Sequence, residues 1–96
     1  MRMTGIDAVI EDTIVARRNM QLGLWAGMRL GYRAERLDAY AREVMEADYY
    51  VSGPDDVIEK ITIDFEDRGI DCPPEFIAME LQRIERSVRA QLLAAD

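Results

Sequence analysis

Histidine is absent from this 96-residue chain, and there is one cysteine, Cys72. A single cysteine cannot form an internal disulfide, and without histidine there is no Cys/His cluster with the spacing of a metal site. The sequence also lacks Gly-x-Ser-x-Gly, the phosphate-binding Gly-x-x-x-x-Gly-Lys-Ser/Thr and any cysteine–histidine arrangement, which mark common catalytic sites. We therefore predict a protein that is not an enzyme, with no catalytic residues, no metal site and no required cofactor.

Long apolar runs are also missing, since none approaches the ~20 residues of a transmembrane helix. Asp7, Glu11 and Asp12 interrupt the apolar core that an export signal would need. With the lone cysteine, this predicts a cytoplasmic protein without direct membrane insertion. Basic residues are outnumbered, because 12 Lys+Arg stand against 19 Asp+Glu, for a formal net charge of −7. Such a chain is repelled by phosphate backbones and by anionic lipid surfaces, so we expect no nucleic-acid partner.

Apolar residues are plentiful, at 49% of the chain, and their spacing predicts four helices in a single domain over residues 1–96. The expected ranges are 6–30, 34–50, 54–68 and 73–94. Short connections marked by glycine or proline make the fold class all-α, a small four-helix antiparallel bundle with a long first helix. The β-branched Ile61-Thr62-Ile63 offers a strand as the alternative within the third range. Helical periodicity and the stop at Gly69 favour the helix.

Each predicted helix has an apolar stripe that would face the core. In the first helix the spacing selects Ile6, Val9, Ile10, Thr13, Ile14, Arg17, Met20, Leu24 and Met28. In the second helix it selects Leu37, Tyr40, Ala41, Val44, Met45 and Asp48. In the third helix the stripe is Val57, Ile58, Ile61 and Phe65, and in the fourth it is Ile77, Leu81, Ile84, Val88 and Leu92.

Gly23, Gly27 and Gly31 recur every four residues in the first predicted helix. This spacing allows either a close approach to a partner helix or internal packing with Gly31 ending the helix, and we favour the internal reading because the close-approach rule is strongest in membranes. Gly23 and Gly27 each cost a helix ~1 kcal/mol relative to alanine. Close packing against the second or fourth helix is the expected compensation. Trp25 is interpreted as a core or half-core residue, with a partner anchor as the alternative.

Two further pairs leave alternatives open. Arg17 and Arg18 either bind a carboxylate or phosphate of a partner or lie on a solvated face. Arg17 is the more informative of the two because it falls within the predicted apolar stripe. Tyr49 and Tyr50 are expected to cover the end of the bundle, and stacking on an adenine is the alternative.

Several short segments follow one another in a distinctive order: Ala16-Arg17-Arg18-Asn19, Leu22-Gly23-Leu24-Trp25-Ala26, Leu30-Gly31, Ala39-Tyr40-Ala41-Arg42-Glu43-Val44, Ala47-Asp48, Gly53, Asp56-Val57-Ile58, Asp64-Phe65 and Gly69-Ile70-Asp71. In order and spacing these resemble the zeta-subunit family of alphaproteobacterial ATP synthases, from roughly residue 16 to the C-terminus. The resemblance implies a four-helix fold and a regulatory ATPase inhibitor that binds the catalytic head of the F-type ATP synthase. It also implies a location peripheral to the inner membrane through that enzyme. We expect a monomer when the protein is free.

The resemblance further implies that the segment before Ala16-Arg17-Arg18-Asn19 is, in that family, a mobile arm that becomes helical between catalytic subunits. Residues 1–15 depart from the pattern, since they are fewer than is typical and contain neither Phe nor Lys. Their aliphatic residues predict that the stretch 7–15 is helical and at least partly docked in the free protein, because it would otherwise expose an apolar stripe. The expected partner-binding residues are Ile6, Val9, Ile10, Ile14, Arg17, Arg18 and Asn19.

Two other functions compete with inhibition of ATP hydrolysis. One is a diverged helical bundle that interacts with another protein and has no inhibitory activity. The other is weak adenine-nucleotide binding, either alone or in addition to the inhibitory role.

Overall fold

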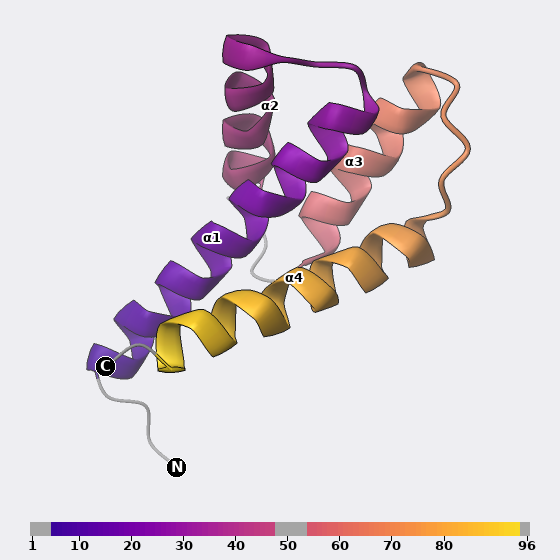
Figure 1. Cartoon of the computed structure of the whole chain (residues 1–96). Coiled ribbons are helices and arrows are strands. Elements are labelled where there is room, and N and C mark those ends of the chain that lie inside the picture. Colours follow the sequence, from indigo (N-terminus) through magenta and orange to yellow (C-terminus); the bar gives the residue numbers. More distant parts are fainter. Residues whose placement is uncertain (1–4, 48–53, 95–96) are drawn as a thin grey trace.

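The computed structural model describes residues 5–47 and 54–94, and these form four helices (Figure 1). They are α1 (Gly5–Arg29), α2 (Ala34–Glu46), α3 (Asp55–Asp67) and α4 (Pro74–Ala94). No strand occurs within the described ranges. Ile61 is fully buried whereas Ile63 is 48% exposed, and both lie within α3, so the helix prediction for this segment is confirmed. The expected end of the second helix at Tyr50, with Tyr49, lies outside the described residues.

The long helix α1 is the centre of the arrangement, because α2 packs beside its C-terminal half and α4 beside its N-terminal half (Figure 1). Contacts pair Gly23 with Ala41 and Gly27 with Leu37, so residue numbers rise along α1 as they fall along α2. Arg18 bonds Glu85 of α4, and Glu11, about two turns earlier in α1, bonds Arg89 farther along α4. Both neighbours therefore run antiparallel to α1, which confirms the antiparallel bundle.

The core lies where the inner faces of the helices meet. Its fully or almost fully buried members are Ile14, Leu22, Ala26, Leu30, Tyr40, Val44, Val57, Ile61, Phe65, Ile77, Leu81, Ile84 and Val88. The predicted stripes of α3 and α4 contribute seven of these residues, and α2 contributes Tyr40 and Val44. Ala41 of α2 is also buried. Asp48, the last residue expected on the α2 stripe, lies outside the described residues.

The buried face of α1 is not the predicted stripe. Only Ile14 of that stripe is buried, while Ile6 is 74% and Met28 60% exposed. The buried face consists of Ile14, Arg18, Asn19, Leu22, Gly23, Ala26 and Gly27. The prediction was wrong because it weighted large apolar side chains, whereas α2 approaches α1 over glycine and alanine, which carry little hydrophobic signal.

Close approach of α1 and α2 accounts for two of the glycines. A Cβ atom built on Gly23 would lie 2.7 Å from the Cα of Ala41, and one on Gly27 would lie 2.6 Å from Cδ1 of Leu37. The internal-packing interpretation of this spacing is therefore confirmed, with α2 as the neighbour. Gly31 ends α1 at φ +89°, where the amide of Tyr32 donates to the carbonyl of Gly27 at 2.9 Å.

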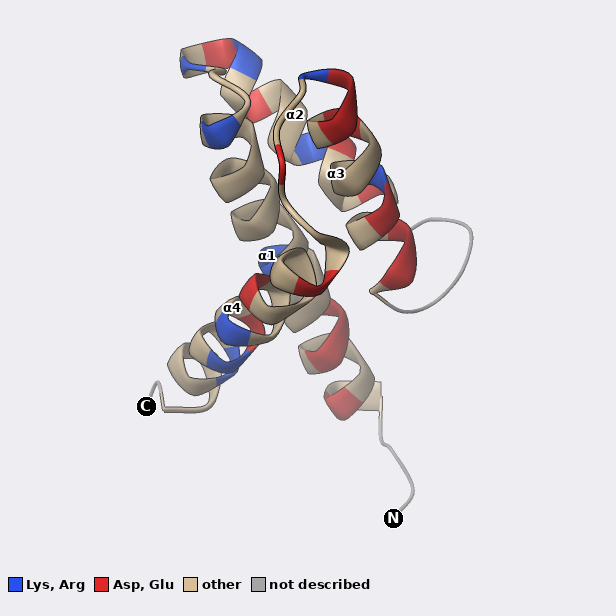
Figure 2. Ribbon diagram, turned by 90° about the vertical axis from the view of Figure 1, so that its right-hand side faces the viewer, with Lys and Arg blue, Asp and Glu red and all other residues tan. Residues whose placement is uncertain are grey.

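A polar network joins α2 to α3 at the edge of the core. The phenol of Tyr40 donates to Asp64 Oδ2 at 2.7 Å, and Lys60 Nζ lies 3.1 Å from the same oxygen and 3.6 Å from Glu43 Oε2. Burial, and then the bond to the Asp64 carboxylate, raise the pKa of Tyr40. The phenol therefore stays protonated and can keep donating. Figure 2 shows how acidic residues gather along α3.

A candidate partner-binding surface on the first helix

The expected partner-binding residues divide between two faces of α1. Ile6, Val9 and Arg17 are exposed, and their side chains face solvent. Ile10 is partly buried against the core. The remaining three face inward: Ile14 is fully buried, and Arg18 and Asn19 are 5% and 1% exposed. A partner can thus reach the first group directly, whereas contact with the second group requires α1 to separate from the helices that cover it.

Arg18 binds α1 to α4 from within the interface. Its Nε donates to Oδ1 of Asn19 at 2.9 Å, and its Nη1 donates to Oε1 of Glu85 at 3.0 Å. Nη2 is buried without a hydrogen-bond partner among the described residues. The sequence predicted that Arg17 lies within the buried stripe. In the structure Arg17 is exposed and Arg18 is buried. Arg18 is the buried one because it lies one position, or about 100°, around the helix toward α4.

The N-terminal half of α1 is held on α4 by a second charged contact. Arg89 bonds both carboxylate oxygens of Glu11, at 2.6 and 3.1 Å, and also lies 3.6 Å from Oε2 of Glu85. With Ile14 buried beside this contact and Ile10 against the core, the predicted helical, partly docked state of residues 7–15 is confirmed. The hydrogen bond from Arg89 is the main cause of the lowered pKa of Glu11.

The outer face of α1, defined by the exposed residues Ile6, Val9, Arg17 and Met28, is not covered by another helix within the described part of the chain. Ile6, Val9 and Met28 are 74%, 64% and 60% exposed. Exposed apolar side chains repeated along one helix face are typical of a surface that binds another protein. These residues belong to the stripe that the sequence analysis assigned to the core. The periodicity was therefore real, but it marks an outer face.

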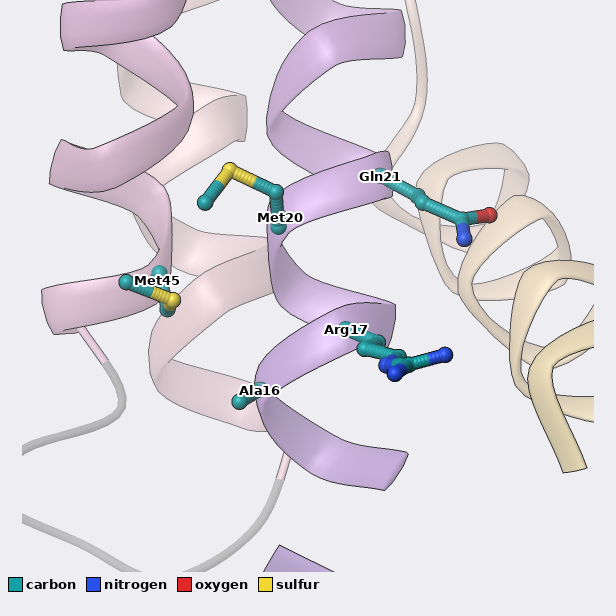
Figure 3. Close-up of a pocket in the computed structure, with 5 residues that line it drawn as sticks. All are labelled: Ala16, Arg17, Met20, Gln21 and Met45. Atoms are coloured by element: carbon teal, nitrogen blue, oxygen red, sulfur yellow. The ribbon is translucent and has the colours of Figure 1, made fainter. Parts of the chain in front are cut away.

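A shallow groove of about 270 Å³ opens beside this face, between α1 and α2. Ala16, Arg17, Met20, Gln21 and Met45 line it (Figure 3). Met20 extends from α1 toward α2, and Met45 lies on the facing turn of α2 (Figure 3). Methionine side chains adapt to varied apolar partners. Arg17 is the one charged residue of the lining, and no ion pair to it occurs among the described residues.

A family model of ATPase inhibitor subunit zeta matches residues 6–91. The chain belongs to this zeta family. The match begins at residue 6, so it takes in most of α1 before the landmarks that start at Ala16, as well as the outer face. No curated protein and no solved structure matches the chain significantly.

Membership of the zeta family agrees with a non-enzymatic, regulatory protein. Burial raises the pKa of the Cys72 thiol, which disfavours the reactive thiolate. Among the described residues, no group of His, Cys, Asp and Glu side chains is arranged to hold a metal ion. No helix in the described ranges is long and apolar enough to cross a membrane. The sequence did not indicate Gln21 or Met45 as binding residues, because only the fold brings Gln21 of α1 and Met45 of α2 to the same groove.

The contact between Glu11 and Arg89 yields a prediction for this zeta-family protein. Replacing Arg89 by glutamine should speed amide hydrogen exchange in the first turns of α1, because the residues before Ile14 lose their charged attachment to α4. Acid should also reduce the protection of these amides, measured relative to the slower intrinsic exchange at low pH. Since the pKa of Glu11 is lowered from its ordinary 4.5, the contact stabilises the docked helix fully above about pH 4.5 and is lost as pH falls through the lowered value.

Arg83→Gln is the matched control, because it removes the same charge from α4 but breaks only the local pair with Glu80 at 2.9 Å. Exchange in α1 should be unchanged in this variant. Equal acceleration in both variants would show that net charge, and not the Glu11 contact, protects the N-terminal turns.

Proposed function

We propose that this protein binds the catalytic head of an F-type ATP synthase and slows ATP hydrolysis. The observation that carries the proposal is the match to ATPase inhibitor subunit zeta over residues 6–91. The exposed apolar row on α1 supports it, because an inhibitor of this kind needs a surface that its target can cover. Through this association the protein would be peripheral to the inner membrane.

The contact is proposed along the outer face of α1, with Ile6 and Val9 as apolar anchors and Arg17 meeting a carboxylate of the partner. Laying the apolar face of a helix in a groove is a common mode of protein recognition. The docked N-terminal half of α1 presents Ile6 and Val9 already ordered, so less conformational entropy is lost when a partner covers them. Arg17 makes no ion pair with the residues that the structure describes, so its guanidinium is available to such a carboxylate.

The test is ATP hydrolysis by the isolated catalytic head of the same organism's enzyme, measured as purified protein is added. The double variant Ile6→Ser/Val9→Ser should need about tenfold more protein for half-inhibition, since ~1.4 kcal/mol of lost apolar contact corresponds to tenfold in affinity. Arg17→Glu should act in the same direction. Met79→Ser is the control, because Met79 is 65% exposed on α4 and lies outside the proposed contact.

Point replacements are preferable to deleting residues 1–15. That deletion would remove Ile14, which is fully buried, and Glu11, which bonds Arg89, so a lost effect would not separate binding from folding. If the folded wild-type protein fails to slow hydrolysis at large excess, the inhibitor proposal is rejected. The alternative of an interaction module without inhibitory activity then stands. Weak adenine-nucleotide binding, the monomeric state and the cytoplasmic location stay predictions.

A further inference from the structure

A second groove lies between α3 and the start of α4, and no residue of α1 is among those that line it. It measures about 280 Å³. Its apolar part is formed by Ile58, Thr62, Ile63 and Pro74, and Ile63 is 48% exposed. An aliphatic side chain so exposed on the outside of a packed helix, within a groove, is available to a partner.

Carboxylates surround this apolar part. Asp55, Glu59 and Glu66 also line the groove, all three are exposed, and none of them makes an ion pair within the part of the chain that the structure describes. The cations of the same segment are engaged elsewhere. Lys60 turns to Asp64 and Glu43, and Arg68 bonds the Leu30 carbonyl and the Tyr32 hydroxyl.

The spacing of these residues defines a line along one helix face. Asp55, Glu59, Thr62 or Ile63, and Glu66 are separated by three or four residues, so they follow one side of α3. From Asp55 to Glu66 this line is ~16 Å long at the rise of an α-helix. A few turns of a second helix, with apolar residues on one side and flanking cations, would match it in length and in charge.

We propose that this groove docks a cationic amphipathic helix of a partner protein. Charge excludes the other occupants. Nucleic acid and anionic membranes are repelled by the carboxylates, and a second copy of this chain, at net charge −7, would place like charges against one another. A helix with Lys or Arg at positions i and i+4 would pair with Glu59 and its neighbours while an apolar side chain covers Ile63. The proposal concerns a different face from the inhibitory contact and does not rest on it.

The experiment uses the whole isotope-labelled chain and a short synthetic peptide of leucine and lysine whose leucines fall on one helical side. Adding the peptide should shift amide resonances of Glu59, Ile63, Glu66 and the first residues of α4, and leave the outer face of α1 unmoved. The double variant Glu59→Gln/Glu66→Gln should bind about fivefold more weakly, the combined effect of two exposed ion pairs. Ile63→Ser should weaken binding to a similar extent.

Asp38→Asn/Glu46→Gln is the matched control, since it removes the same charge from exposed positions on α2 and should bind like wild type. A second peptide of the same composition, with its leucines scattered around the helix, should bind more weakly than the first. Shifts centred outside α3 and the start of α4, equal weakening in both double variants, or equal binding of the two peptides would each overturn the proposal. Circular dichroism of every variant confirms that the helices are intact.

Discussion

Replacing Phe65 by alanine should lower the free energy of unfolding by ~3–5 kcal/mol, the usual cost of removing a buried aromatic ring. Phe65 is fully buried and packs its ring 6.0 Å from that of Trp25. The cavity would lie where α3 meets α1, and neighbouring helices cannot close it without losing their own contacts. In a domain of this size such a loss is a large part of the total stability. Chemical denaturation followed by circular dichroism measures it.

Phe76 supplies the matched control. Its ring lies 6.2 Å from that of Trp25, almost the same separation, but the residue is 43% exposed. Phe76→Ala should therefore cost only about 1 kcal/mol, the value of an aromatic contact with little burial. Equal losses in the two variants would mean that the ring contact with Trp25, and not burial in the core, determines the contribution of each ring.

Replacing Gly23 by alanine should also destabilise the protein, although helix propensity alone favours the change by ~1 kcal/mol. The added methyl would lie 2.7 Å from the Cα and 3.1 Å from the carbonyl oxygen of Ala41. Both are backbone atoms of α2, so relief requires α1 and α2 to move apart. Overpacking of this kind costs ~1–3 kcal/mol beyond any local gain, and we expect a net loss in that range.

Gly5→Ala tests the propensity argument without the clash, because nothing lies within 4 Å of a Cβ atom at that position. Its stability should be unchanged or slightly raised. Thermal unfolding of both variants measures these changes in stability. A rise in the midpoint for Gly23→Ala would show that the two helices separate at little cost, and that their close approach contributes little to the fold.

The groove beside the candidate surface depends on the same close approach of α1 and α2. Glycine at positions 23 and 27 lets α2 lie directly on α1, which brings Met45 beside Met20 and forms the groove of Figure 3. Larger residues would hold α2 away and open that groove. The variant Gly23→Ala thus links stability to function, since it should weaken any partner contact that uses the groove as well as the fold itself.

Much of the molecule follows from local sequence. Four helices, their ends at Gly31 and Gly69, and the buried stripes of α3 and α4 were all predicted, since periodicity and helix-ending glycine act within a few residues of one another. The landmark segments also identified the zeta family, which the match over residues 6–91 confirms. In α3 and α4 the large apolar side chains themselves form the buried face, so the local pattern was enough to predict it.

The first helix shows what only the tertiary structure decided. Several of its large apolar residues face outward, and its buried side includes glycine, alanine, Asn19 and Arg18. This is because α1 packs between α2 and α4, and the sides that these two helices cover are the sides that become buried. Arg18 can lie inside because Glu85 and Asn19 satisfy part of its guanidinium, and those partners are fixed by packing between helices. The sequence by itself therefore determined which segments are helical and which family they form, whereas the packing of α2 and α4 determined which side of α1 is left for a partner.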